Sequence, residues 1–257
     1  MNTPVAAPTV DVTLQRIAAA TCVWGVLYVA VRYVAAPSLC KEIKPDKVAY
    51  YAATIISTLQ AQVCFFGTLY FGIEGKIWAQ PDDFHLATDG TFLLIYSFIG
   101  YLVQDFVILL YYNHSWSGNT PFLVHHVLSI VAWGDCAFAG TAHNVALSLM
   151  LCEGTAIFVN GRYLLTEHGC KESVIYLANG AMMAISFAIL RIAGMAYWFV
   201  RFMYVSGDQY WSLPYRTTGF LTPIYLAGYA IQLHWFRLIC KGLYKALTKK
   251  QAPSKAA

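Results

Sequence analysis

Charged side chains are scarce in this chain. Asp, Glu, Lys and Arg make up 12% of its 257 residues, about half of the share typical of a soluble domain. The seven cysteines are scattered singly with no C-x-x-C pair, which argues against a structural zinc site and a disulfide framework. No nucleic-acid motif accompanies the small net charge of +4. These absences argue against a soluble domain and against a nucleic-acid partner.

Long apolar runs take the place of the missing charge. The chain is 58% hydrophobic with a mean hydropathy of +0.53, and about 20 apolar residues suffice to cross a bilayer as a helix. The runs show no period-2 alternation, so helices rather than a membrane barrel are expected. The sequence predicts an all-α, polytopic membrane protein with about seven transmembrane helices, near residues 17–36, 49–73, 91–112, 121–139, 143–165, 174–201 and 217–240.

Lysines gather at the C-terminal end of the chain. Five of them lie between Lys241 and Lys255 with no acid among them, and the connection after the first helix adds Lys41, Lys44 and Lys47. Seven helices place both regions on the same side of the membrane, and the positive-inside rule makes that side cytosolic. We therefore expect a cytosolic C-terminus.

Two adjacent histidines, His125 and His126, lie at the head of the fourth predicted helix. Titratable groups at membrane depth are costly and tend to face a bundle interior or a wet cavity, and imidazole suits proton transfer near neutral pH. Asp105 lies at a similar depth in the third helix. A contact between Asp105 and one histidine would fix the tautomer of that histidine. His126 shares a helical face with Trp133, a candidate substrate contact. The three titratable residues form either a catalytic group or a structural hydrogen bond between helices.

Further polar residues occur in the fifth and sixth predicted helices. Glu153 and Asn160 are seven residues apart and share a helical face, Glu153 as a candidate catalytic carboxylate and Asn160 as a candidate substrate contact. Arg162 either anchors its helix at the interface or reaches a substrate phosphate. Arg191 cannot face lipid cheaply, so we expect it to pair with Glu153, with Asp105 or with a lipid phosphate.

The order of these residues along the chain resembles the TRAM–LAG–CLN8 (TLC) domain family. The resemblance rests on Asp105 after a Gly-Tyr pair, on the paired histidines of the next helix, and on the run from Glu153 to Asn160-x-Arg162. It covers roughly residues 49–245 and is closest to the small stand-alone TLC-domain transmembrane proteins.

The resemblance implies an organisation, a ligand class and a location. It divides the chain into an N-terminal segment with the first helix at 1–48, a TLC domain at 49–245 and a basic cytosolic tail at 246–257. It implies helices that enclose a lipid-sized cavity, membrane lipids as partners, and residence in the endoplasmic reticulum or connected endomembranes. A homodimer and a membrane-protein partner are both compatible with it.

Two functions follow from the resemblance. The family's enzymes, the ceramide synthases, join an acyl group from acyl-CoA to a sphingoid amine and carry a His-Asp-x-x-Asp signature, for which this chain has Cys152, Glu153 and Ala156. The missing histidine and second acid favour long-chain lipid binding and homeostasis without turnover. The alternative is an acyltransferase, with a histidine as general base and acyl-CoA as co-substrate.

Metal chemistry is not expected. Outside the histidine pair, the helices carry only the isolated His143 and His234, with no H-x-x-x-H spacing, whereas a zinc hydrolase or a desaturase needs several grouped histidines. The sequence therefore predicts neither a bound metal nor a bound cofactor.

Overall fold

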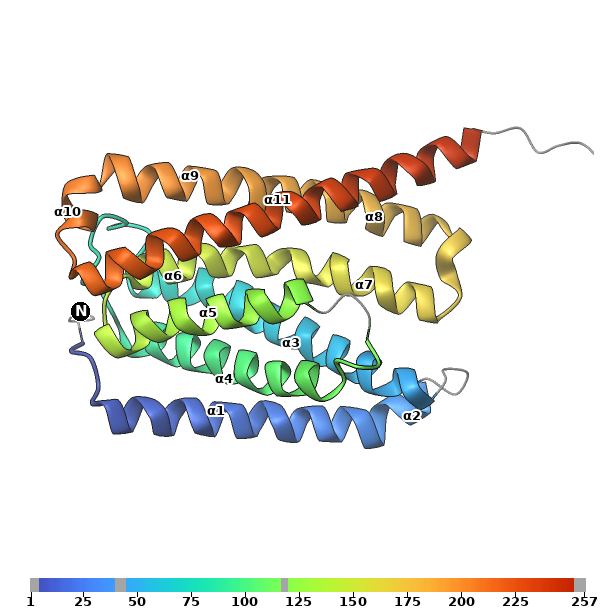
Figure 1. Cartoon of the computed structure of the whole chain (residues 1–257), viewed down its shortest axis with the longest axis horizontal. Coiled ribbons are helices and arrows are strands. Elements are labelled where there is room, and N and C mark those ends of the chain that lie inside the picture. Colours follow the sequence, from blue (N-terminus) through green and yellow to red (C-terminus); the bar gives the residue numbers. More distant parts are fainter. Residues whose placement is uncertain (1–4, 40–44, 117–119, 252–257) are drawn as a thin grey trace, which may run out of the picture.

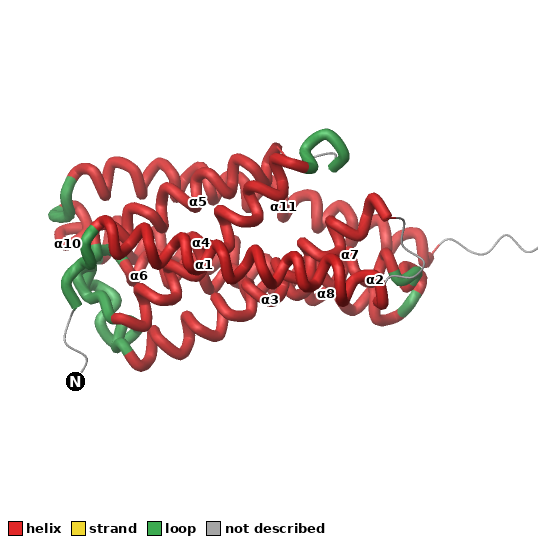
Figure 2. The backbone as a smooth tube through the Cα atoms, turned by 90° about the horizontal axis from the view of Figure 1, so that it is seen from below, coloured by secondary structure: helices red, strands yellow, loops and turns green. Residues whose placement is uncertain are grey.

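The computed structural model is a bundle of long helices that run side by side (Figure 1). It describes residues 5–39, 45–116 and 120–251, and no strand occurs among them. The elements in chain order are α1 (Val10–Ala30), η1 (Val31–Ala35), α2 (Ala36–Leu39), α3 (Pro45–Glu74), α4 (Asp89–Tyr111), α5 (Thr120–Ala139), α6 (His143–Met150), η2 (Leu151–Thr155), α7 (Ala156–Glu167), η3 (Cys170–Glu172), α8 (Val174–Ser186), η4 (Phe187–Gly194), α9 (Met195–Val200), η5 (Arg201–Val205), α10 (Gly207–Trp211) and α11 (Tyr215–Gln251). Figure 2 shows that the loops gather at the ends of the bundle.

Six helical stretches of the described chain are long and apolar enough to cross a membrane. The predicted fold class, an all-α polytopic membrane protein, is confirmed. The six stretches are Val10–Leu39, Lys47–Glu74, Asp89–Tyr111, Thr120–Ala139, His143–Glu167 and Val174–Val205.

The seventh predicted span, 217–240, lies within α11 and differs from the others. At 37 residues α11 is long enough to cross a bilayer, and in Figure 1 it runs along the length of the bundle. It is not among the six because Gln232, His234 and Arg237 interrupt its apolar run. Gln232 is buried, so part of this polarity faces the protein interior rather than lipid. The predicted start of the basic tail at 246 falls inside the same helix, and residues 252–257 lie outside the described chain.

Three of the six spans are not continuous α-helices: the first contains the π-helical η1, and the other two carry residues of the polar site. A 3-10 segment, η2, joins α6 to α7, and a π-helical segment, η4, joins α8 to α9. Glu153 lies on η2 and Arg191 on η4. Turns of the π type are rare and frequently mark functional sites. The hydropathy of the sequence did not indicate either segment, because 3-10, α and π turns bury the same apolar side chains.

Helix α1 packs along α4 at one edge of the bundle (Figure 1). The two backbones meet closely at Gly100, where an added Cβ would lie 2.6 Å from the Ala20 Cβ and 2.7 Å from the Thr21 backbone nitrogen. The indole N–H of Trp24 donates to the Ser97 carbonyl oxygen over 3.1 Å. Small residues that let helices approach are the usual basis of packing in membranes.

Replacement of Gly100 by alanine is expected to destabilise the protein by about 1–3 kcal/mol relative to Gly25→Ala, the usual cost of overpacking. Both changes give a similar gain in helix propensity, but the Gly25 Cβ would have no atom within 4 Å. Thermal unfolding of the two variants in detergent measures the difference. Equal melting temperatures would contradict the close approach of α1 and α4.

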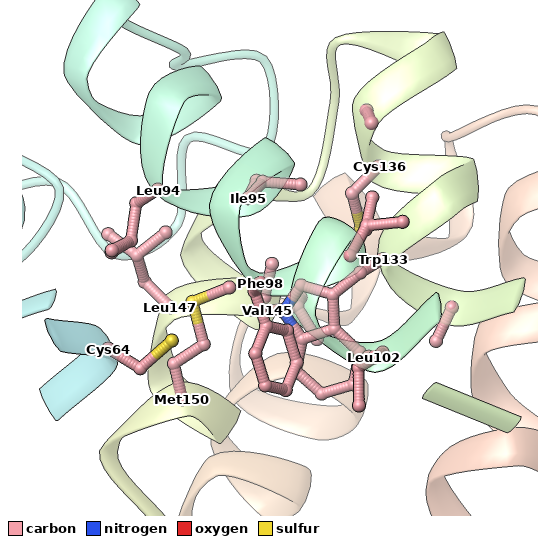
Figure 3. Close-up of a cluster of buried hydrophobic side chains, with 14 of the residues drawn as sticks. Cys64, Leu94, Ile95, Phe98, Leu102, Trp133, Cys136, Val145, Leu147 and Met150 are labelled. Carbon is pink, nitrogen blue, oxygen red and sulfur yellow. The ribbon is translucent and has the colours of Figure 1, made fainter. Parts of the chain in front are cut away.

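A cluster of buried apolar side chains lies where α3, α4, α5 and α6 meet (Figure 3). Phe98 and Trp133 meet edge to face there, with ring centroids 5.0 Å apart. Cys64 and Cys136 are buried free thiols that pack in this cluster as small hydrophobes, whereas Cys22 and Cys240 are exposed. Phe98 and Leu102 of this cluster also line the cavity described next.

Candidate functional site

A cavity of about 270 Å³ lies inside the bundle. Its wall is mostly apolar, and α4, α5, α7, α8 and α11 all contribute to it. Five of the polar residues singled out in the sequence line it: His125, His126, Glu153, Asn160 and Arg191. The tertiary structure therefore brings together side chains from four separate segments of the chain. Such a setting, apolar with a few convergent polar groups, is typical of a ligand site.

His126 and Asp105 form the contact expected between the third and fourth helices. The Nε2 atom of His126 lies 3.0 Å from Oδ2 of Asp105, and both side chains are buried. The other ring nitrogen, Nδ1, lies 2.8 Å from the Phe122 carbonyl oxygen. Because a carbonyl oxygen only accepts, Nδ1 carries a proton and donates it. The short Nε2–Oδ2 contact then holds one further proton between imidazole and carboxyl.

This geometry separates the roles of the two histidines. Both ring nitrogens of His126 are occupied, so no nitrogen of its ring is left to accept a substrate proton. His125 makes no hydrogen bond within the described residues, and its ring packs on Trp235 with centroids 5.6 Å apart. Asp105 therefore orients the buried histidine, and His125 is the imidazole with nitrogens open to the cavity.

Arg191 is held by groups from two neighbouring elements. Its Nε donates to the Cys152 carbonyl oxygen (3.1 Å) and to Oγ1 of Thr155 (2.7 Å). Nη1 donates to Oε1 of Gln232 on α11 (3.1 Å), and Nη2 lies 3.4 Å from Oε1 of Glu153. Of the three partners weighed for Arg191 in the sequence, the structure selects Glu153. The pair satisfies two charges that would otherwise be costly in the membrane.

A smaller cavity of about 70 Å³ adjoins the first. The two share Phe98, His125, Glu153 and Arg191 as lining residues. Trp133, the predicted substrate contact, lines the smaller cavity, and its buried indole N–H has no hydrogen-bond partner in the described structure. The polar residues of the site thus lie at the junction of two apolar spaces.

The remaining candidates, Asn160 and Arg162, take different positions. The amide nitrogen of Asn160 donates to the hydroxyls of Ser57 (3.1 Å) and Thr58 (3.0 Å), which ties α7 to α3. Asn160 therefore has a structural partner as well as a place in the cavity wall. Arg162 does not line the main cavity and lies over the ring of Tyr176, 4.2 Å from its centroid.

Sequence reasoning missed three residues of the site, Ser57, Tyr101 and Trp235. The Tyr101 hydroxyl lies close to the side chains of Ser57 and Asp105, and Trp235 of α11 packs on His125. Tyrosine and tryptophan are abundant at membrane boundaries, so neither stood out. The Gly-Tyr pair before Asp105 was the only sequence signal for Tyr101. No such signal marked Trp235.

Fold and site together define a polytopic helical membrane protein with a mostly apolar cavity that holds a few polar groups. Its family follows from sequence comparison: a model of the TLC domain matches residues 51–241, most of the chain, and the chain belongs to the TLC domain family. The predicted resemblance is thereby confirmed.

Three relatives illustrate the match. TLC domain-containing protein 4-B of Danio rerio is 26% identical over 225 residues, which cover 84% of this chain and 81% of the relative. TLC domain-containing protein 4 A of Dictyostelium discoideum is 24% identical over 237 residues, covering 87% and 89%. TLC domain-containing protein 1 of Gallus gallus is 27% identical over 140 residues, covering 52% and 55%. These relatives are stand-alone TLC proteins.

Proposed function

We propose that this protein binds a long-chain lipid in its intramembrane cavity and takes part in the homeostasis of membrane sphingolipids or phospholipids. The observation that carries the proposal is the open imidazole of His125 in the wall of an apolar cavity of about 270 Å³. An apolar wall accommodates an acyl chain, because burying methylene groups away from water is favourable. A few fixed polar groups then recognise the head group.

The fixed polar groups suit recognition of a hydroxyl or an amine. His125 offers a ring nitrogen, and the Glu153 carboxylate and the Asn160 amide lie in the same wall. Their positions are set by the contacts of Glu153 with Arg191 and of Asn160 with α3. Polar groups held in place before the ligand arrives lower the entropic cost of binding.

A second function, acyl transfer, is favoured by one observation. The His125 ring has no hydrogen-bond partner among the described residues and lines both cavities, and a general base requires such an accessible nitrogen. In that reaction a lipid amine or hydroxyl attacks the thioester carbon of acyl-CoA, the new amide or ester bond forms, and the C–S bond breaks. His125 takes the proton of the nucleophile and returns it to the leaving thiolate. The neighbouring His126–Asp105 pair would hold the helix that carries this base.

Location and orientation are part of the proposal. The start of α3, which carries Lys47, and the C-terminal part of α11, which carries Lys241 and Lys245, lie towards the same end of the bundle in Figure 1. Lys41 and Lys44 lie outside the described residues. The basic end is proposed to face the cytosol, in the endoplasmic reticulum or connected membranes. A homodimer or another membrane protein is the proposed class of protein partner.

Filling the cavity tests the lipid-binding proposal. Val159→Trp places an indole where Val159 lines the cavity, and Val131→Trp makes the same change at a similarly exposed valine outside both cavities. We expect a long-chain lipid to co-purify with the wild type and with Val131→Trp, and to be reduced severalfold in Val159→Trp. Quantitative mass spectrometry of extracted lipids gives the ratio. Equal lipid content in the two variants would show that the lipid does not bind in this cavity.

A further inference from the structure

Arg162 is a cation without a carboxylate partner in the described structure. The described ion pairs use Arg191, Arg201, Arg216 and Lys47, and none includes Arg162. Arg162 lies near the end of the fifth span, where an unpaired charge close to hydrocarbon is costly. An unpaired guanidinium in this position is suited to an anionic ligand.

The guanidinium packs against α8. It lies 4.2 Å from the ring centroid of Tyr176, a cation–π contact with α8. One turn along α8, a Cβ at Gly180 would lie 2.6 Å from Nη1 of Arg162, so a larger residue there would displace the guanidinium from its present position. A charge that snorkels freely to the interface would need neither contact.

The guanidinium faces a recess that is separate from the main cavity but adjoins it. The recess has a volume of about 220 Å³ and lies between Arg162, Gly180 and Gly242. Its remaining wall includes Met183, Leu238 and Ile239, which also line the main cavity. These three shared side chains connect the cation to the apolar space beside the histidines.

We propose that this recess is an anion-binding site for a phosphate group of a lipid-like ligand whose acyl chain extends into the main cavity. The inference rests on the proposed lipid-binding function and specifies the ligand as one that carries phosphate. Phosphate offers several acceptor oxygens to a guanidinium fork. Two exposed lysines, Lys241 and Lys245, flank Gly242 of the recess wall and add positive charge to this region. The phosphate belongs either to a glycerophospholipid head group or to acyl-CoA.

Two pairs of ligands distinguish these sources. Dioleoyl phosphatidate is compared with dioleoylglycerol, and oleoyl-CoA with the oleoyl thioester of N-acetylcysteamine, which lacks phosphate. Native mass spectrometry of the full-length protein gives each dissociation constant. In Arg162→Gln we expect affinity for the phosphate-bearing member of at least one pair to fall about tenfold or more, the effect of one charge-assisted contact. The pair that responds identifies the source of the phosphate.

Three further variants control for folding and for general charge. Arg162→Lys keeps the charge and should retain part of the affinity. Gly180→Ala keeps the arginine but displaces it, so it should weaken phosphate binding as well, whereas Gly25→Ala should not. Arg237→Gln removes an exposed cation of α11 that lines neither space, and should leave all four affinities unchanged.

The outcomes separate this inference from the function on which it rests. If Arg162→Gln binds all four ligands as tightly as the wild type does, the anion site is overturned and the lipid-binding function is not. If the variant loses affinity equally for the charged and uncharged members of each pair, the anion site is also overturned, because Arg162 would then act only on the fold. If the wild type binds none of the four ligands, both the lipid-binding function and the anion site fail.

Discussion

Replacement of Arg191 by methionine is expected to lower the free energy of unfolding by about 3–5 kcal/mol, the cost of leaving one partner of a buried ion pair alone. The change removes donors to Cys152, Thr155, Gln232 and Glu153. The Glu153 carboxylate would then lie in the bundle without its only described cation. Because these contacts join η2, η4 and α11, their loss should also loosen the junction of the two cavities.

An exposed ion pair of the same protein is the matched control. Arg201 lies 2.7 Å from Asp82, but the Asp82 side chain is 43% exposed, and a pair of this kind contributes about 1 kcal/mol or less. Arg201→Met should therefore change stability far less than Arg191→Met. Denaturant or thermal unfolding in the same detergent compares the two variants.

A double replacement checks the cause of the Arg191 effect. Arg191→Met combined with Glu153→Leu removes both charges, and replacing a buried ion pair with apolar residues is often close to neutral. The double variant should recover much of the stability lost in Arg191→Met. If it is as unstable as the single variant, the unpaired carboxylate is not the cause of the loss.

Substitution of the two adjacent histidines is expected to give opposite results. His125→Ala should abolish the change in cellular lipids that follows expression of the wild type. It should have little effect on folding, because His125 makes no hydrogen bond to a described group. His126→Ala should mainly destabilise the protein, because it removes the hydrogen bonds to Asp105 and Phe122. A buried carboxyl group without its partner costs several kcal/mol in a membrane.

Lipidomics of cells at matched protein levels measures the first effect, and the melting temperature of purified protein measures the second. Asp105→Asn, which keeps a polar group opposite His126, should fall between the wild type and His126→Ala in stability. If His125→Ala alters lipids as the wild type does, the open imidazole has no part in the function. Acyl transfer by this residue would then be excluded.

Several features of the site could be predicted from the sequence because the membrane makes polar residues conspicuous. An acid, a histidine pair and an arginine in apolar runs stand out at once, and the depth of Asp105 placed it opposite the next helix. The same argument could not choose between His125 and His126 as its partner. That choice depends on the rotation of α5, which brings His126 against α4 and turns His125 towards Trp235 of α11.

The sequence by itself determined the class of fold, since long apolar runs can satisfy their backbone in lipid only as helices. It also determined the family, through the order of polar residues on successive helices. Only the tertiary structure decided that Arg191 pairs with Glu153, that Asn160 binds α3, and that Arg162 faces a recess of its own. These contacts join residues far apart in the chain, and local 3-10 and π turns set the angles at which they project. The spacing of residues along a regular helix indicates neither these long-range contacts nor these angles.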